Sequence, residues 1–180
     1  MDIEKCKDEF AKREIMWLVF QGALSMGYPV YKQNHGVTPE DRVIFKQYLS
    51  ERLEEYAKHV NRSLNDKEYI KILEKFENDI RNYKHKEILK YDGLTFGRVQ
   101  KLLNLYLKYL WVFNQPQSID PPPHCPIDST ILGKIDWPYP DIKWTMPIFT
   151  VQKYQEAIDL CRKKTKDDIA GWELQMFNNR

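Results

Sequence analysis

The sequence predicts an all-α protein, a single globular domain of about seven helices spanning residues 1–180. Two observations favour this class. Apolar residues recur at helical spacing through most of the chain, and no stretch shows the convincing alternation of apolar and polar residues that is typical of a half-buried strand. A chain of this length can bury a sizeable core.

The first half of the chain predicts three helices. The first covers about residues 3–26 and ends at Gly27, which the turn-forming residues Tyr28 and Pro29 follow. The second begins with Thr38 as the N-cap residue and proline in the first helical position, and its apolar stripe runs to Val60. The third begins at Asn65 and presents an apolar face as far as Ile80.

The second half predicts a long central helix, a proline-rich loop at 114–126 and three further helices. Thr95 is expected to cap the central helix, and Thr150 the helix that follows the aromatic loop around Trp137. The predicted helices are residues 96–113, 128–135, about 151–161 and 168–177. A long loop inside a compact domain is often functional, which draws attention to the segment just before residue 128.

Composition sets limits on the function. The net charge of +2 permits nucleic-acid binding but does not demand it. The three cysteines are odd in number and far apart, which argues against a disulfide framework and favours reduced thiols in the cytoplasm. The histidines are scattered, so we expect neither a metal site nor a cofactor. The apolar run at 15–20 is too short to span a bilayer, so we expect no membrane partner.

The most specific pattern is a turn, a helix, a loop and an aspartate, in that order, between residues 93 and 135. The sequence Gly-Leu-Thr-Phe-Gly forms the turn, and Asp128 opens the helix after the loop. Backbone N–H groups at such a turn can hold a phosphate. Arg98 and Lys101 follow it and could extend contact with a nucleic-acid backbone, which predicts a binding site made of Gly93, Gly97, Arg98 and Lys101.

Residues 93–132 resemble the helix-hairpin-helix core of DNA glycosylases. The turn between Gly93 and Gly97 occupies the place of the hairpin, and Pro-Ile-Asp-Ser-Thr-Ile at 126–131 occupies the place of the aspartate motif. The resemblance implies that Asp128 is the catalytic carboxylate, which stabilises positive charge on the deoxyribose and places the nucleophile. It also implies a nucleic-acid partner, with DNA expected, and excision of a damaged or modified base.

Two further expectations follow from this resemblance. Bifunctional members carry a Schiff-base lysine two residues after the second hairpin glycine, and that position is Val99 here, so hydrolysis by water without a lysine adduct is expected. An enzyme of this kind must flip the base out of the stack and hold it between apolar or aromatic side chains. The candidates near the aspartate in sequence are Trp111, Trp137, Tyr139 and Trp144.

Other interpretations of the same residues stay open. Asp128 can be an ordinary helix cap, the basic residues an ordinary solvated face, and the aromatic residues core. The chain can then be a non-catalytic α-helical module that binds nucleic acid or another protein, with exposed aromatic residues forming an oligomer interface. Whether the protein is an enzyme, and its oligomeric state, are not fixed by sequence. His124 and Cys125 offer a further nucleophile pair, although neighbours in sequence seldom face one another.

Overall fold

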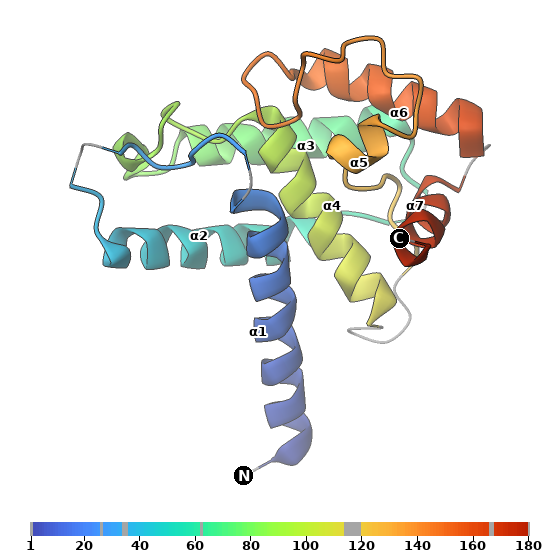
Figure 1. The fold of residues 1–180 in the computed structure, drawn as a ribbon. Coiled ribbons are helices and arrows are strands. Elements are labelled where there is room, and N and C mark those ends of the chain that lie inside the picture. The colour runs from blue at the N-terminus through green and yellow to red at the C-terminus, as the bar shows by residue number, and fades with distance from the viewer. Residues whose placement is uncertain are drawn as a thin grey trace.

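The protein is all-helical in the part of the chain that the computed structural model describes, which is residues 2–25, 27–33, 36–61, 63–113, 120–165 and 168–179. Figure 1 shows its helices in chain order. Their bounds are α1 Ile3–Leu24, α2 Pro39–Ala57, α3 Asp66–Arg81, the short 3-10 helix η1 Lys86–Ile88, α4 Phe96–Val112, α5 Ser129–Leu132, α6 Val151–Thr165 and α7 Ile169–Asn178. None of these helices is both long enough and apolar enough to cross a membrane.

Helix α4 is the centre of the fold. It packs against α1, α2 and α3, and Figure 1 shows it crossing the middle of the molecule. Every residue from Phe96 to Lys108 is buried, including charged and amide side chains. A helix that is covered on all sides is usually apolar all round, so the polar groups of α4 are unusual. Their partners define the candidate site described below.

Helices α2 and α3 begin with the residues that the sequence predicts. At α2 the hydroxyl of Thr38 accepts the backbone N–H of Asp41 at 3.1 Å, and the Asp41 carboxylate accepts the Thr38 N–H at 2.9 Å. At α3 the side chains of Asn65 and Glu68 form the same reciprocal pair. These capping boxes satisfy N–H groups that have no partner inside the helix.

A short backbone pairing connects the segment after α1 to the segment before α4. Tyr31 and Leu89 form an isolated antiparallel bridge, flanked by the hydrogen bonds from Lys32 N–H to the Ile88 carbonyl and from Lys90 N–H to the Val30 carbonyl, both 2.9 Å. The turn that leads into α4 comes after η1, a helix of three residues. The bridge holds this part of the chain close to the segment that follows α1.

Several predicted helix boundaries need correction. The first helix ends at Leu24 rather than 26, and the central helix ends at Val112 rather than 113. Helix α5 is only Ser129–Leu132, because the chain continues from Leu132 in turns instead of extending to residue 135. Thr95 does stand at the N-cap position of α4, but its hydroxyl makes no capping bond. The part of the predicted proline-rich loop at 114–119 lies outside the described residues.

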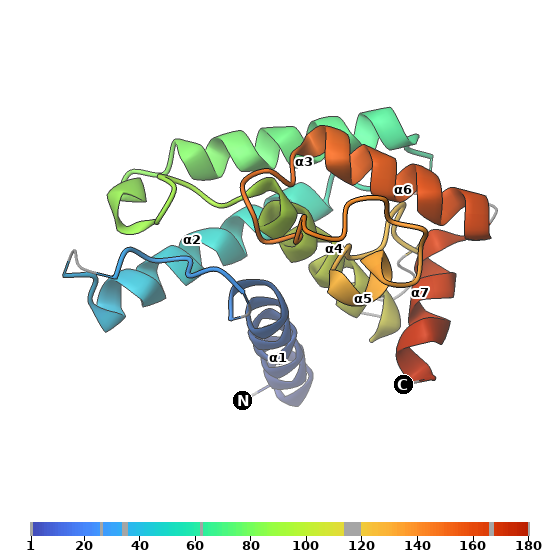
Figure 2. The same cartoon turned by 45° about the horizontal axis from the view of Figure 1, so that its top comes forward.

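Helix α1 is divided between the body and solvent. Its second half buries Ile15, Val19 and Ala23, where α1 packs on α4. Its first half, residues 3–13, extends away from the other helices in Figure 1 and is almost wholly exposed. We call residues 3–13 the free half of α1. Figure 2, turned by 45°, shows α3 and α6 on the side of the molecule away from the N-terminus.

Candidate functional site

Asp128 is the N-cap residue of α5 and is held by three donors. One carboxylate oxygen accepts the backbone N–H groups of Thr130 and Ile131 at 2.9 and 3.1 Å. The other accepts the ammonium group of Lys101 at 3.0 Å. The Asp128 side chain is 23% exposed, so it is neither fully enclosed nor open to solvent. The carboxylate thus ties α5 to α4 while it caps α5.

Lys101 is enclosed between this carboxylate and an aromatic ring. Its side chain is 9% exposed, and its ammonium nitrogen lies 4.4 Å from the centre of the Trp144 ring. Trp144 is itself buried. A cation that is desolvated over an indole face and paired with a carboxylate is strongly stabilised in place. The structure therefore brings Lys101, and not Val99, to Asp128.

Gly97 allows the loop that carries Trp144 to cover the start of α4. A Cβ atom added at Gly97 would lie 1.7 Å from the carbonyl oxygen of Trp144, so only glycine fits beneath this backbone. Gly93 and Gly97 are both buried. Of the turn predicted to meet a phosphate, Gly97 is covered by the backbone of Trp144, and Gly93 lies against Arg81.

The basic residues of α4 point to different elements instead of forming one basic face. Arg98 donates to the backbone carbonyls of Ala23 and Tyr28, at the end of α1 and just beyond it. Lys101 meets α5, and Lys108 donates to Glu173 of α7 at 2.9 Å. Burial lowers the pKa of Arg98 to about 10, which leaves it charged at neutral pH. These three cations are thus buried against three different elements of the chain.

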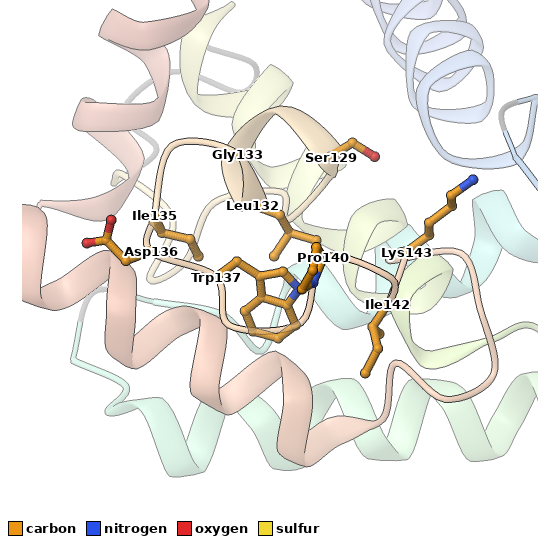
Figure 3. Close-up of a pocket in the computed structure, with 9 residues that line it drawn as sticks. All are labelled: Ser129, Leu132, Gly133, Ile135, Asp136, Trp137, Pro140, Ile142 and Lys143. Carbon is orange, nitrogen blue, oxygen red and sulfur yellow. The ribbon is translucent and has the colours of Figure 1, made fainter.

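A hollow of about 680 Å³ lies next to α5 (Figure 3). Its lining residues are Ser129, Leu132, Gly133, Ile135, Asp136, Trp137, Pro140, Ile142 and Lys143. In Figure 3 the Ser129 hydroxyl and the Lys143 ammonium extend away from the Trp137 ring, so that apolar groups surround the ring. Ser129 follows Asp128 in the chain, but the Asp128 carboxylate turns to Lys101 instead.

The four aromatic candidates do not gather around one point. Trp137 lines the hollow, and Tyr139 packs edge-on against it with ring centres 5.1 Å apart. Trp144 covers Lys101. Trp111 lies in the last turn of α4, which is about 15 Å along the helix axis from Lys101. Trp137 alone of the four contributes to the hollow beside α5.

A buried hydrogen-bonded chain crosses the core from α4 to α6. Gln100 donates to the carbonyl of Ile127 at 2.7 Å and accepts the Ile127 N–H at 3.1 Å, which fixes the segment before Asp128. Asn104 donates to Gln100 and to the Tyr154 hydroxyl, each at 3.0 Å, and accepts from the Tyr69 hydroxyl at 2.6 Å. These groups are all buried and all paired, so the chain fixes the relative positions of α3, α4 and α6.

The same chain continues through His124 to an ion pair. One ring nitrogen, Nδ1, lies 2.8 Å from the Tyr154 hydroxyl, and the other, Nε2, lies 2.9 Å from the Asp66 carboxylate. Arg162 donates to both oxygens of Asp66. A neutral His124 that donates through Nε2 and accepts at Nδ1 satisfies every partner. Burial lowers the pKa of His124, and this outweighs the opposing effect of Asp66.

His124 and Cys125 do not form a nucleophile pair. Both ring nitrogens of His124 are used by Tyr154 and Asp66. Burial raises the pKa of the Cys125 thiol, which keeps it protonated. Among the residues that the structure describes, no group of three or more His, Cys, Asp or Glu side chains is arranged to hold a metal ion.

Comparisons with protein-family models, with curated proteins and with solved structures found no match. Sequence reasoning found Asp128 as a cap but missed its pairing with Lys101 and the whole chain around Asn104. The sequence does contain one signal of these buried polar contacts. Helix α4 carries cations and amides but no acidic residue, and it is otherwise apolar on every side.

Proposed function

We propose that this protein is a non-catalytic α-helical protein-interaction module that binds its partner through the free half of α1 and the adjoining Trp17. One observation carries the proposal: Ile3, Phe10 and Trp17 are 62%, 57% and 56% exposed on a helix whose first half stands away from the body. Scattered exposed apolar residues are common on any protein. Three large ones in a row on one projecting helix, two of them aromatic, are typical of a binding surface.

The geometry around Asp128 supports the non-catalytic part of this proposal. The carboxylate already accepts three hydrogen bonds, one of them from the enclosed ammonium of Lys101. A catalytic carboxylate must instead face the reacting atoms. The basic residues that would meet a nucleic-acid backbone are buried and paired with other parts of the chain. The contacts of each of these groups hold the fold together, so none of them needs a catalytic role to explain its position.

Site-specific photocrosslinking tests the proposal. A photoreactive benzophenone side chain is placed at Phe10 in one variant and at Lys12 in the other, which is also exposed but turned about 200° around the same helix. We expect ultraviolet light to join the Phe10 variant to a protein, identified by mass spectrometry, and to join the Lys12 variant far less. Equal crosslinking at both positions, or none at Phe10, would contradict a binding surface along this row.

A second candidate function is excision of a DNA base with Asp128 as the catalytic carboxylate. The observation in its favour is the hollow beside α5, in which a flipped base could lie against Trp137. The Asp128 carboxylate would stabilise the positive charge that develops on the sugar while water attacks, and the base would be the leaving group. In that case Lys101 is an amine in direct contact with the Asp128 carboxylate, so the expectation of no lysine adduct based on Val99 needs a direct test.

Oligonucleotides that carry damaged and modified bases distinguish this second function from the first. Abasic product is expected from the natural chain and not from Asp128→Asn, with Asp136→Asn as the control at an exposed acid lining the same hollow. Borohydride treatment then reports whether Lys101 forms an imine with the sugar. Equal product from both variants, or none from the natural chain, rejects Asp128 as a catalytic residue.

A further inference from the structure

We propose that the partner of α1 is a second copy of this chain, and that the two α1 helices pair antiparallel along the exposed side of residues 3–18. This inference rests on the proposed interaction function and names the partner. Three features carry it: the seven-residue spacing of the exposed apolar row, the position of that row opposite the anchoring face of α1, and a self-complementary charge pattern around Phe10.

The apolar row has the spacing of a helix-pairing seam. Ile3, Phe10 and Trp17 are seven residues apart, so each lies about 20° from the last around the helix, which places all three on one face. Cys6 and Arg13 lie between them at steps of three and four, where a second set of seam residues belongs. Arg13 lies over the Phe10 ring at 5.1 Å, so its aliphatic stem can cover the same seam.

This seam is not used by the protein's own fold. Ile15, Val19 and Ala23 bury the face of α1 that packs on the body. Trp17 is two residues after Ile15 and therefore points to nearly the opposite side. The free half of α1 extends away from the other helices (Figure 1), which leaves the seam there open to a partner helix.

The charges that flank the seam fit the same segment in reverse. Lys7 and Glu14 lie within about 60° of Phe10 around the helix, on one edge of the seam, whereas Asp8 and Lys12 lie about 200° away, on the anchoring side. In an antiparallel pair centred between Phe10 and Ala11, Lys7 lies opposite Glu14 of the other copy. This attractive pair occurs twice, as two-fold symmetry requires.

A parallel pair does not have this property. In a parallel pair, Glu9 of one copy flanks the seam beside Glu14 of the other, and like charges at a helix interface are unfavourable. Because the body of each chain lies at the C-terminal end of α1 (Figure 1), parallel pairing brings the two bodies side by side, whereas antiparallel pairing places them at opposite ends of the seam. The competing ion pairs within α1, such as Lys7 with Glu4, are 65% and 78% exposed and contribute little.

Sedimentation equilibrium on the full chain is the first test. We expect a concentration-dependent species of twice the 21.7 kDa of one chain. Phe10→Glu with Trp17→Glu should raise the dissociation constant about 100-fold or more, because two central aromatic anchors are lost. Val43→Glu with Ile44→Glu is the matched control, since these side chains are 64% and 54% exposed on α2, and it should change nothing.

Charge exchange tests the antiparallel register. Lys7→Glu alone and Glu14→Lys alone should each weaken the dimer, and the two together should restore it, because each residue faces the other one across the two-fold axis. Exposed Cys6 gives an independent check. Antiparallel pairing separates the two Cys6 residues by about 13 Å along the helices, which is too far for a disulfide. Rapid Cys6–Cys6 oxidation would overturn the register.

The outcomes separate this inference from the proposed function. A monomer at all concentrations together with crosslinking of Phe10 to a different protein would overturn the dimer and leave the interaction function standing. A monomer with no crosslink at Phe10 would overturn both. A dimer unaffected by the Phe10 and Trp17 changes would show that another surface mediates association and would reject the α1 pairing.

Discussion

The ammonium group of Lys101 lies 3.0 Å from the carboxylate of Asp128, and only 9% of the lysine side chain reaches solvent. This contact joins the central helix to the segment that the sequence marks as the candidate catalytic motif. It gives the aspartate two structural roles at once, as the cap of α5 and as the counter-ion of a buried cation. Changes at either residue should therefore appear first in stability.

Asp128→Asn should destabilise the protein even though asparagine can still cap α5. The substitution leaves the enclosed Lys101 without a negative partner, a loss that we expect to cost about 3 kcal/mol. Lys101→Met combined with Asp128→Asn should cost less than the sum of the single changes. Urea denaturation measures all three, with Asp136→Asn, 92% exposed, expected to stay within about 0.5 kcal/mol of the natural chain.

Gly97→Ala should be among the most damaging single-methyl additions in the protein. The new Cβ would lie 1.7 Å from the Trp144 carbonyl oxygen, which is backbone and can move only with its whole loop. We expect a loss of about 3 kcal/mol and a change in tryptophan fluorescence as Trp144 leaves Lys101. Gly133→Ala, with its nearest atom at 3.3 Å, serves as control; a comparable loss there would mean that crowding at Gly97 is not special.

Stability should fall as the pH is lowered through the range just below 6.5, because of His124. Burial lowers the folded-state pKa of this ring below its unfolded value of about 6.5. Between the two values the unfolded chain binds the extra proton, so the free energy of unfolding decreases with falling pH at up to about 1.4 kcal/mol per unit. In His124→Gln the slope between pH 7.5 and 5.5 should flatten; an unchanged slope would assign it to another group.

Below pH 4 a second group should add to this loss. The Asp66 carboxylate is partly buried, which alone would raise its pKa, but the hydrogen bonds from Arg162 and His124 hold the pKa well below its usual range. The folded state then keeps Asp66 ionised while the unfolded state takes up a proton below about 3.9. Its stabilisation is present above that pH and is lost below it. In Asp66→Asn this acid limb should be reduced.

The ion pair between Lys108 and Glu173 should matter far more than a surface pair of the same length. Its two side chains are each 7% exposed, and the Lys108 ammonium nitrogen lies 2.9 Å from Oε1 of Glu173. The pair attaches α7 to α4. Glu173→Gln should cost about 3 kcal/mol and increase hydrogen exchange in α7. Glu156→Gln removes the partner of Lys153 at 3.0 Å on the surface and should cost less than about 1 kcal/mol. Equal costs would show that burial is not the deciding factor.

The sequence of this protein predicts the start of each helix better than it predicts the tertiary contacts around it. The capping boxes at Thr38 and Asn65 depend on residues three positions apart, so the starts of α2 and α3 can be predicted from the chain alone. Asp128 as a helix cap is local in the same sense. Boundaries such as the early end of α5 depend on the loop that follows, whose course is fixed by distant contacts.

The polar side chains of α4 could not be interpreted without the tertiary structure. Arg98 and Lys101 suggest a basic surface when the helix is considered alone, yet their partners are carbonyls of Ala23 and Tyr28 and the carboxylate of Asp128. The partners of Arg98 lie about 70 residues away in sequence. Nothing in the spacing of α4 distinguishes a cation that awaits a phosphate from one whose counter-ion or carbonyl lies within the same chain.

The division of α1 between core and solvent has a thermodynamic consequence. Ile15, Val19 and Ala23 contribute to the folding free energy, whereas Ile3, Phe10 and Trp17 contribute almost nothing to it while they are exposed. A peptide of about eleven residues is marginally helical by itself, so the order of residues 3–13 depends on propagation from the anchored half. Affinity for a partner and stability of the body can therefore vary independently along one continuous helix.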